Sequence, residues 1–347
     1  MELMKEVVGN YKNKEVIEYT MRNNNGIEVS VLNFGGIIRK IITPDNKGNL
    51  ENIVLAYRDI EDYFTNSSYY GALIGRTSGR IGGSKAILND EEYEFYPNYN
   101  PNSGHGGKEG FDKKFWTVEE ISSNNECGVE LNYYSPDGEE GYPGNVSVKV
   151  TYTLNNNNEL KFLIKGNSDK DTLFNITNHS YFNLSGDYKR DITKSELMIN
   201  SDEYLEINNT GSVTGEVINS KNTPFDFTVK KEIGKDINIK DKQLELGNGY
   251  DHPFLFNSEK GNIVLEDRES GRGLEVETNQ QAVVIYTANY PGDEELENGE
   301  KPKFRGGICL ETQSPPISES GTFIEHSILR KNEEYSKETK YKFYLIK

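Results

Sequence analysis

The chain has 347 residues, of which 34% are hydrophobic and 27% are charged, so we expect a folded globular protein with a sizeable core. It contains no run of about 18 apolar residues, and we therefore expect no transmembrane helix. Its formal net charge of −17 argues against nucleic acid and anionic membranes as partners.

The hydrophobic pattern repeats mainly every second residue, which is the period of a half-buried β-strand. In chain order, the first candidate strands are 27–34 and 36–43. Segment 59–64 is the one short stretch with a helical pattern. A further candidate strand covers 128–134.

The clearest strand signal is a pair of alternating runs in the middle of the chain. Apolar residues occupy every second position over 146–154 and again over 160–164. The intervening Asn155 to Asn158 suits a tight turn, because asparagine tolerates the positive φ that such turns require. These two runs therefore predict a β-hairpin.

Strand candidates continue to the C-terminal end of the chain. They are 196–200, 253–256, 262–267, 273–278, 282–288 and the alternating run at 341–345. The 33 glycines and 22 tyrosines suit turns and sheets better than helices. Since no linker or shift in composition divides the chain, we predict an all-β fold, a large single-domain antiparallel β-sandwich covering residues 1–347.

The cellular compartment is predicted from the N-terminus and the cysteines. The N-terminus lacks the apolar stretch and cleavage site of a signal peptide. Cys127 and Cys309 are too few for a disulfide framework and lack metal-ligand spacing. We therefore expect a cytoplasmic protein. The sequence leaves open whether it is a monomer or a homodimer.

Two of the four histidines lie in unusual surroundings. His105 is flanked by glycine in PNSGHGG, which predicts an accessible loop, and it has either a role there or none. His179 lies in the aromatic segment FNITNHSYFNLSG, where a hydrogen-bonded core histidine is the ordinary alternative. His252 lies beside Asp251, and His326 near the C-terminal end looks incidental.

Glu311 is the most notable carboxylate, because it follows the apolar run at 308–310. A carboxylate on a buried strand is partly desolvated, and desolvation raises the pKa of a carboxyl group towards that of a usable base. Asp251 follows a glycine-rich stretch and is expected on a loop at the end of a strand. In GRTSGR, either Arg76 or Arg80 could bind a sugar hydroxyl or a carboxylate, or form a structural ion pair.

Several sequence motifs are absent. HxH and HExxH metal patterns, the Gly-x-Ser-x-Gly elbow, phosphate loops and dinucleotide fingerprints do not occur. We therefore expect neither a metal nor a cofactor.

Seven segments, in order, resemble the successive signatures of the aldose 1-epimerase (galactose mutarotase) family. They are GALIGRTSGRIGGSKAILNDEEYEF, NSGHGGKEGFDKKFW, SPDGEEGYPGNVSVKVTYTL, NITNHSYFNLSG, NTPFDF, GYDHPF and ICLETQ. The resemblance spans roughly residues 25–345 and is specific, because HGG before GFDKxxW, NHSYFNL and LETQ occur in matching order. It implies a large β-sandwich, in agreement with the period-two pattern.

The resemblance also implies roles for five residues. His179 matches the general acid that protonates the ring oxygen, and Glu311 matches the general base that takes the proton of the C1 hydroxyl. His105 matches a second histidine that hydrogen-bonds the sugar and assists at the ring oxygen. Asp251 and Arg80 match residues that hold the substrate. The implied activity is interconversion of the α and β anomers of free hexoses such as galactose and glucose, without cofactor or metal.

Two positions depart from the pattern of the family. Many members carry Asn where this chain has Gly79, and Gln where it has Val284. Both positions contact the sugar in relatives, so the preferred aldose is left open.

Three alternative functions compete with this reading. A hexose-6-phosphate 1-epimerase would need a basic cluster for the phosphate. A glycosidase would use Asp251 and Glu311 as its carboxylate pair, which leaves the histidines without a role. A non-catalytic carbohydrate-binding protein would not need His179 and Glu311 together.

Overall fold

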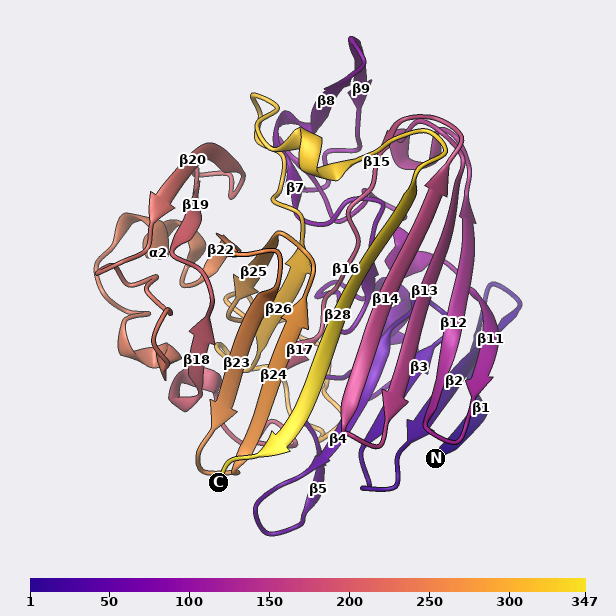
Figure 1. Ribbon diagram of the computed structural model, residues 1–347, viewed down its shortest axis with the longest axis vertical. Helices are drawn as coiled ribbons and strands as arrows, with labels where there is room; N and C mark the ends of the chain where they lie inside the picture. The colour runs from indigo at the N-terminus through magenta and orange to yellow at the C-terminus, as the bar shows by residue number, and fades with distance from the viewer.

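The computed structural model describes residues 1–347 as an all-β protein, which confirms the predicted fold class. Its largest sheet has nine strands and forms the front layer in Figure 1. In spatial order these strands are β11 (Thr117–Ser122), β12 (Glu126–Ser135), β13 (Val146–Asn155), β14 (Glu159–Ser168), β28 (Glu334–Leu345), β24 (Arg272–Thr278), β23 (Gly261–Asp267), β18 (Glu196–Ile199) and β21 (Lys231–Glu232).

Two further sheets lie behind the large one (Figure 1). One has six strands, in the order β17 (Tyr181–Phe182), β26 (Ile308–Gln313), β25 (Ala282–Tyr286), β22 (Asp251–Leu255), β19 (Glu203–Ile207) and β20 (Val213–Asn219). The other has five strands, β1 (Glu2–Tyr11), β2 (Lys14–Arg22), β3 (Glu28–Leu32), β4 (Ile38–Pro44) and β5 (Leu50–Asn52).

The remaining elements are short. Four two-stranded ladders pair β7 (Arg80–Ile81) with β10 (Ser103–Gly104), β6 (Leu73–Ile74) with β16 (Thr177–Asn178), β8 (Lys85–Leu88) with β9 (Glu91–Glu94) and β15 (Thr172–Leu173) with β27 (Ile328–Leu329). The α-helices are α1 (Asp62–Thr65) and α2 (Lys242–Gly247). Single 3₁₀ turns occur at Gly82–Ser84, Phe111–Lys113, Glu139–Gly141, Ile192–Lys194, Ile233–Lys235 and Ile324–Ser327. None of these helices has the length and apolar character needed to span a membrane.

The predicted hairpin is confirmed as β13 and β14. Leu154 pairs with Leu160 across the asparagine turn, where Asn158 has a φ of 62°. Each of the other predicted strands overlaps an observed one. The predicted helix at 59–64 is wrong in extent, because only Asp62–Thr65 is helical and the chain before it turns.

The core lies between the nine-stranded sheet and the two sheets behind it. A single cluster of 49 buried hydrophobic side chains runs from Tyr19 to Phe343 in the sequence. All six residues of β26 (Ile308–Gln313) are buried, including those on the face of the strand that points away from the core. A carboxylate on such a strand is removed from water by the fold itself.

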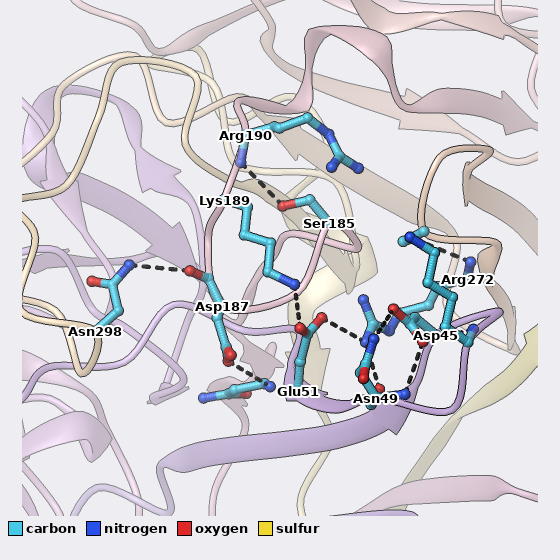
Figure 2. A network of polar contacts seen from close by, with 12 residues as sticks. Asp45, Asn49, Glu51, Ser185, Asp187, Lys189, Arg190, Arg272 and Asn298 are labelled. Carbon is cyan, nitrogen blue, oxygen red and sulfur yellow. Dashed lines mark hydrogen bonds and ion pairs between the residues drawn. The ribbon is translucent and has the colours of Figure 1, made fainter.

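A buried ion pair joins two of the sheets (Figure 2). Arg272 of β24 is 2% exposed and donates to the Oε2 of Glu51 of β5 at 2.9 Å. Its guanidinium group also donates to the carbonyl oxygens of Thr43 and Asn49, each at 3.2 Å. Lys189 pairs with Glu51 from the other side. Residues of the five-stranded sheet are thereby fastened to the nine-stranded sheet.

Candidate active site

A cavity of about 430 Å³ opens on the face of the six-stranded sheet that points away from the core. All five site residues predicted from the sequence line it. They are Arg80, His105, His179, Asp251 and Glu311. They come from five separate segments of the chain, and only the fold brings them together.

The floor of the cavity is built by three neighbouring strands, β22, β25 and β26. Val284 lies directly opposite Glu311 on one side and Pro253 on the other. Directly opposite residues in an antiparallel pair share a face, with Cβ atoms about 4.5–5.5 Å apart. Two positions along, Tyr286 lies between Asp251 and Cys309 in the same way. The floor is therefore a grid of two parallel rows of side chains.

His179 lies at the edge of this floor, in the turn between β16 and β17. Its backbone is fixed on both sides, because its N–H donates to Ala72 O at 2.9 Å and its carbonyl oxygen accepts from the Gly71 N–H at 3.1 Å. Asn178 next to it also donates to Gly71 O, at 2.7 Å. This short, doubly anchored turn holds the imidazole in one place.

Both nitrogens of the His179 ring face polar atoms of β26. Nε2 lies 3.4 Å from Oε1 of Glu311. Nδ1 lies 3.6 Å from the Sγ of Cys309, within reach of a hydrogen bond to sulfur. Burial lowers the pKa of His179 to about 4, because a charged imidazolium would be poorly solvated there.

Glu311 shows the opposite shift. It is 3% exposed, and burial raises its pKa well above the ordinary value of a glutamate. The nearby carboxyl group of Asp251 raises the pKa further, and the Arg80 guanidinium partly offsets this effect. The expectation that strand burial would raise the pKa of this carboxyl group agrees with its surroundings.

His105 approaches the cavity from the loop after β10, with a φ of 53° in the left-handed region. Gly106 follows it with a φ of 85°, and a Cβ there would lie 1.8 Å from Gly75 O, so this position requires glycine. The rings of His105 and His179 are 5.3 Å apart, edge to face. Burial, the His179 ring and the Arg80 charge lower the pKa of His105 well below its ordinary value.

Arg80 and Asp251 form the polar end of the cavity. Their Nη2 and Oδ2 atoms are 3.8 Å apart, and the guanidinium carbon lies 5.2 Å from the centre of the Tyr99 ring. Burial raises the pKa of Asp251, and Arg80 partly offsets that shift. Asp251 is the first residue of β22, so it lies at the end of a strand but within it and not on the predicted loop.

The other arginine of GRTSGR has a structural role. The Arg76 side chain is buried and donates to Ser135 Oγ at 2.8 Å and to the carbonyl oxygens of Pro143 and Gly144 at 3.0 and 2.9 Å. It does not line the cavity. Of the two arginines, only Arg80 can reach a ligand there.

The two remaining histidines lie outside the cavity. His252 is fully buried, its Nε2 is 3.1 Å from Gln243 Oε1, and burial lowers its pKa to about 3. His326 is exposed in the last 3₁₀ turn. His252 lies outside the cavity because side chains alternate along a strand, so it points to the opposite face of β22 from Asp251.

Several lining residues were not predicted from the sequence. Five tyrosines line the cavity, namely Tyr69, Tyr99, Tyr181, Tyr286 and Tyr290. With 22 tyrosines in the chain, no local signal marks these five. Cys309 was also missed as a neighbour of His179, although its position two residues before Glu311 on a strand places both on one face.

Gly79 and Val284, the two positions that depart from the family pattern, both line the cavity. Gly79 has a φ of 69°, and a Cβ there would lie 2.9 Å from the Pro316 ring. A side chain at this position therefore requires Pro316 to move.

Three possible metal ligands lie close together at the cavity floor, a grouping that the sequence spacing does not reveal. One nitrogen of His179, the Cys309 Sγ and a Glu311 oxygen all lie within 4.8 Å of one another. An imidazole, a thiol and a carboxylate are donors that a zinc ion accepts. The same His179 and Glu311 are also the two groups best placed for proton transfer.

The cavity thus presents an imidazole and a carboxyl group side by side, with hydrogen-bonding groups at its far end. Such a site can remove a proton from one oxygen of a small polar ligand and deliver a proton to a neighbouring oxygen.

Comparison with known proteins identifies the family. The family described as aldose 1-epimerase matches residues 18–342. Human galactose mutarotase is 37% identical over 321 residues, 91% of each chain, and aldose 1-epimerase of Haemophilus influenzae is 37% identical over 300 residues, 86% of each chain. The crystal structure of galactose 1-epimerase from Lactobacillus acidophilus superposes with a TM-score of 0.90 at 31% identity, over 100% of this chain and 99% of that one. The chain belongs to the aldose 1-epimerase family.

Proposed function

We propose that the protein is an aldose 1-epimerase, an isomerase that interconverts the α and β anomers of free hexoses such as galactose and glucose. The 3.4 Å contact between His179 Nε2 and Glu311 Oε1 at the floor of a cavity of about 430 Å³ carries the proposal. The membership of the family supports the same activity.

Ring opening needs two proton transfers on neighbouring oxygens. The pair shares one ionisable proton, and in the reacting form this proton lies on His179. Glu311, as a carboxylate, then takes the proton of the C1 hydroxyl as the C1–O1 bond becomes a carbonyl. His179 gives a proton to the ring oxygen as its bond to C1 breaks. Rotation about C1–C2 presents the other carbonyl face, and reclosure returns the proton from Glu311 to O1 and from the ring oxygen to His179. The pair therefore ends each turnover as it began.

The pKa values of the two groups are shifted in opposite directions. In water, a proton prefers imidazole to a carboxylate by about two pKa units. Burial lowers the pKa of His179 and raises that of Glu311, so it works against this preference and lets the proton move between the two groups. We propose that His105 assists at the ring oxygen, and that Arg80 and Asp251 hold the hydroxyl groups farther along the ring.

The cavity does not favour a phosphorylated substrate. Arg80 is the only lysine or arginine that lines it, and its charge already faces Asp251. A phosphate group would need several further cationic donors.

We also propose that the chain forms one domain and acts in the cytoplasm as a monomer or a homodimer. The core cluster, which draws on residues from Tyr19 to Phe343, supports the single domain. Cys127 and Cys309 are both buried and unpaired, which suits a reducing compartment.

The test follows the anomerisation of fresh α-galactose and α-glucose by polarimetry. We expect His179→Asn and Glu311→Gln each to lower the catalysed rate by about 10²–10⁴, the usual contribution of a positioned acid or base. His326→Asn and Glu266→Gln are matched controls outside the cavity and keep the wild-type rate. A wild type that does no better than buffer on any free aldose would disprove the proposed function.

A further inference from the structure

One row of side chains crosses the whole floor of the cavity. Val284 lies between Glu311 and Pro253 in the β22–β25–β26 register. On the other side of Glu311, the β17–β26 register extended by two residues places His179 opposite it, in agreement with their 3.4 Å contact. The order along the row is therefore His179, Glu311, Val284, Pro253.

This row fixes which part of a sugar meets Val284, given the acid–base roles of the proposed function, on which this inference rests. The anomeric carbon C1 bonds to the ring oxygen, to O1 and to C2. With the ring oxygen against His179 and O1 against Glu311, the third substituent, C2, extends to the next position of the row. Neighbouring strands are about 4.8 Å apart, so this next position is within reach of the C2 substituent.

The row offers no hydrogen bond at that point. Val284 is 8% exposed at the cavity floor, and neither its side chain nor that of Pro253 carries a donor or an acceptor. The hydroxyl-binding pair, Arg80 and Asp251, stands at the far end of the other row. We propose that Val284 and Pro253 form an apolar wall beneath C2. The enzyme then accepts 2-deoxyaldoses with a kcat/KM similar to that for the corresponding 2-hydroxy sugars.

How strongly the enzyme discriminates between 2-hydroxy and 2-deoxy sugars depends on whether this wall is polar or apolar. A site built to hydrogen-bond a hydroxyl rejects the analogue that lacks it by about 10⁴–10⁵, because a buried polar group is left unpaired. An apolar wall leaves nothing unpaired and tolerates either ligand within about 10². For the wild type we therefore expect kcat/KM for glucose and for 2-deoxyglucose to agree within about 10².

The experiment measures kcat/KM for α-glucose and α-2-deoxyglucose by NMR, with the rate in buffer subtracted for each sugar. Val284→Thr keeps the shape of valine and adds a hydroxyl, and Val284→Gln adds an amide. Each should raise the glucose-to-2-deoxyglucose ratio by about two- to tenfold, the effect of one net hydrogen bond. Val217→Thr, the same change on β20 outside the cavity, keeps the wild-type ratio.

The proposal is overturned if the wild type prefers glucose by more than about 10². It is equally overturned if both Val284 variants fold and keep the wild-type ratio. Acceleration of neither sugar by the wild type has a different meaning, because it disproves the epimerase activity itself.

Discussion

Burial displaces the pKa values of His179 and Glu311 in opposite directions, and a pH profile will report both shifts. Below about pH 4, His179 takes a proton while Glu311 is already protonated, so no base remains. Above the raised pKa of Glu311, the pair loses its last proton and no acid remains. We expect a bell-shaped profile of kcat/KM with an acid limb near pH 4 and an alkaline limb above the ordinary range of a carboxyl group.

The measurement is polarimetry from about pH 3 to about pH 10, with the buffer rate subtracted at each point. The macroscopic values belong to the pair and not to either residue alone. A single acid limb near pH 6.5, the ordinary value of histidine, would contradict the shifts described for the free enzyme.

Cys309 acts on the same pair from the other side of the imidazole. A thiol can both donate and accept, so it can partner Nδ1 of His179 whichever ring nitrogen carries the proton. Cys309→Ala removes this partner and should lower kcat by about two- to tenfold, the effect of one net hydrogen bond. Cys309→Ser supplies a hydroxyl and should restore most of the rate.

The readout for this prediction is the acid limb of the pH profile together with kcat. A role in packing alone would lower the stability of both variants and leave the limb in place. Equal loss of kcat in the serine and alanine variants would therefore contradict the hydrogen-bonding role.

The sequence predicts the polar residues of the site better than it predicts the residues that contact them. His105, His179 and Glu311 stand out because glycines, aromatic residues or an apolar run surround them. Cys309 and the five tyrosines do not stand out, because the fold and not the local sequence brings them to the site.

Among the elements, the loop that joins β19 to β20 controls the polar end of the cavity. Gly211 in this loop has a φ of 75°, and a Cβ there would lie 3.0 Å from the guanidinium carbon of Arg80. Asn102 holds the loop by donating to Thr210 O at 3.2 Å and to Thr210 Oγ1 at 2.9 Å. The position of Arg80 thus depends on a hairpin that is remote from it in the sequence.

Gly211→Ala should displace Arg80 and raise KM about tenfold or more, since a hydrogen bond to a charged group is worth about 1.5–3 kcal/mol. Gly48→Ala is the matched control, because Gly48 has a φ of 86° and no atom within 4 Å of its Cβ position. Both variants bear the same left-handed backbone strain, about 1–2 kcal/mol, so their melting temperatures should fall alike. An equal rise in KM in both would argue against the steric explanation.

The elements themselves could be predicted where the alternation was strong. The β13–β14 hairpin combines a clear period of two with a turn of four asparagines, and its position is correct. β1 and β2 were not predicted, because neither strand alternates strictly between apolar and polar residues and no residue of β1 is fully buried. Two-residue ladders such as β7 with β10 are too short to leave any pattern.

In the whole molecule, the ion pair of Arg272 and Glu51 joins the nine-stranded sheet to the five-stranded sheet (Figure 2). Removing it tests how much this connection contributes to stability. Arg272→Ala leaves the mostly buried Glu51 with less charge compensation and should lower the free energy of unfolding by about 3–5 kcal/mol. The double variant Glu51→Gln with Arg272→Met removes both charges and should lose clearly less. Urea denaturation measures both values.

Anomerisation by the folded fraction of these variants should match the wild type, because neither residue lines the active-site cavity. The sequence could not reveal this ion pair, since its partners are separated by 221 positions in the chain. A double variant as unstable as Arg272→Ala would show that packing around the guanidinium group, and not charge, holds the two sheets together.

The place of β28 in the nine-stranded sheet has a consequence for synthesis on the ribosome. β28 (Glu334–Leu345) lies between β14 and β24, so the middle of the sheet is filled by a strand that is translated after all its neighbours. Until it emerges, the two halves of the sheet have no hydrogen-bonded connection and each presents an open edge. The nascent chain must keep those edges apart from other proteins, and the sheet can be completed only after β28 has left the ribosome.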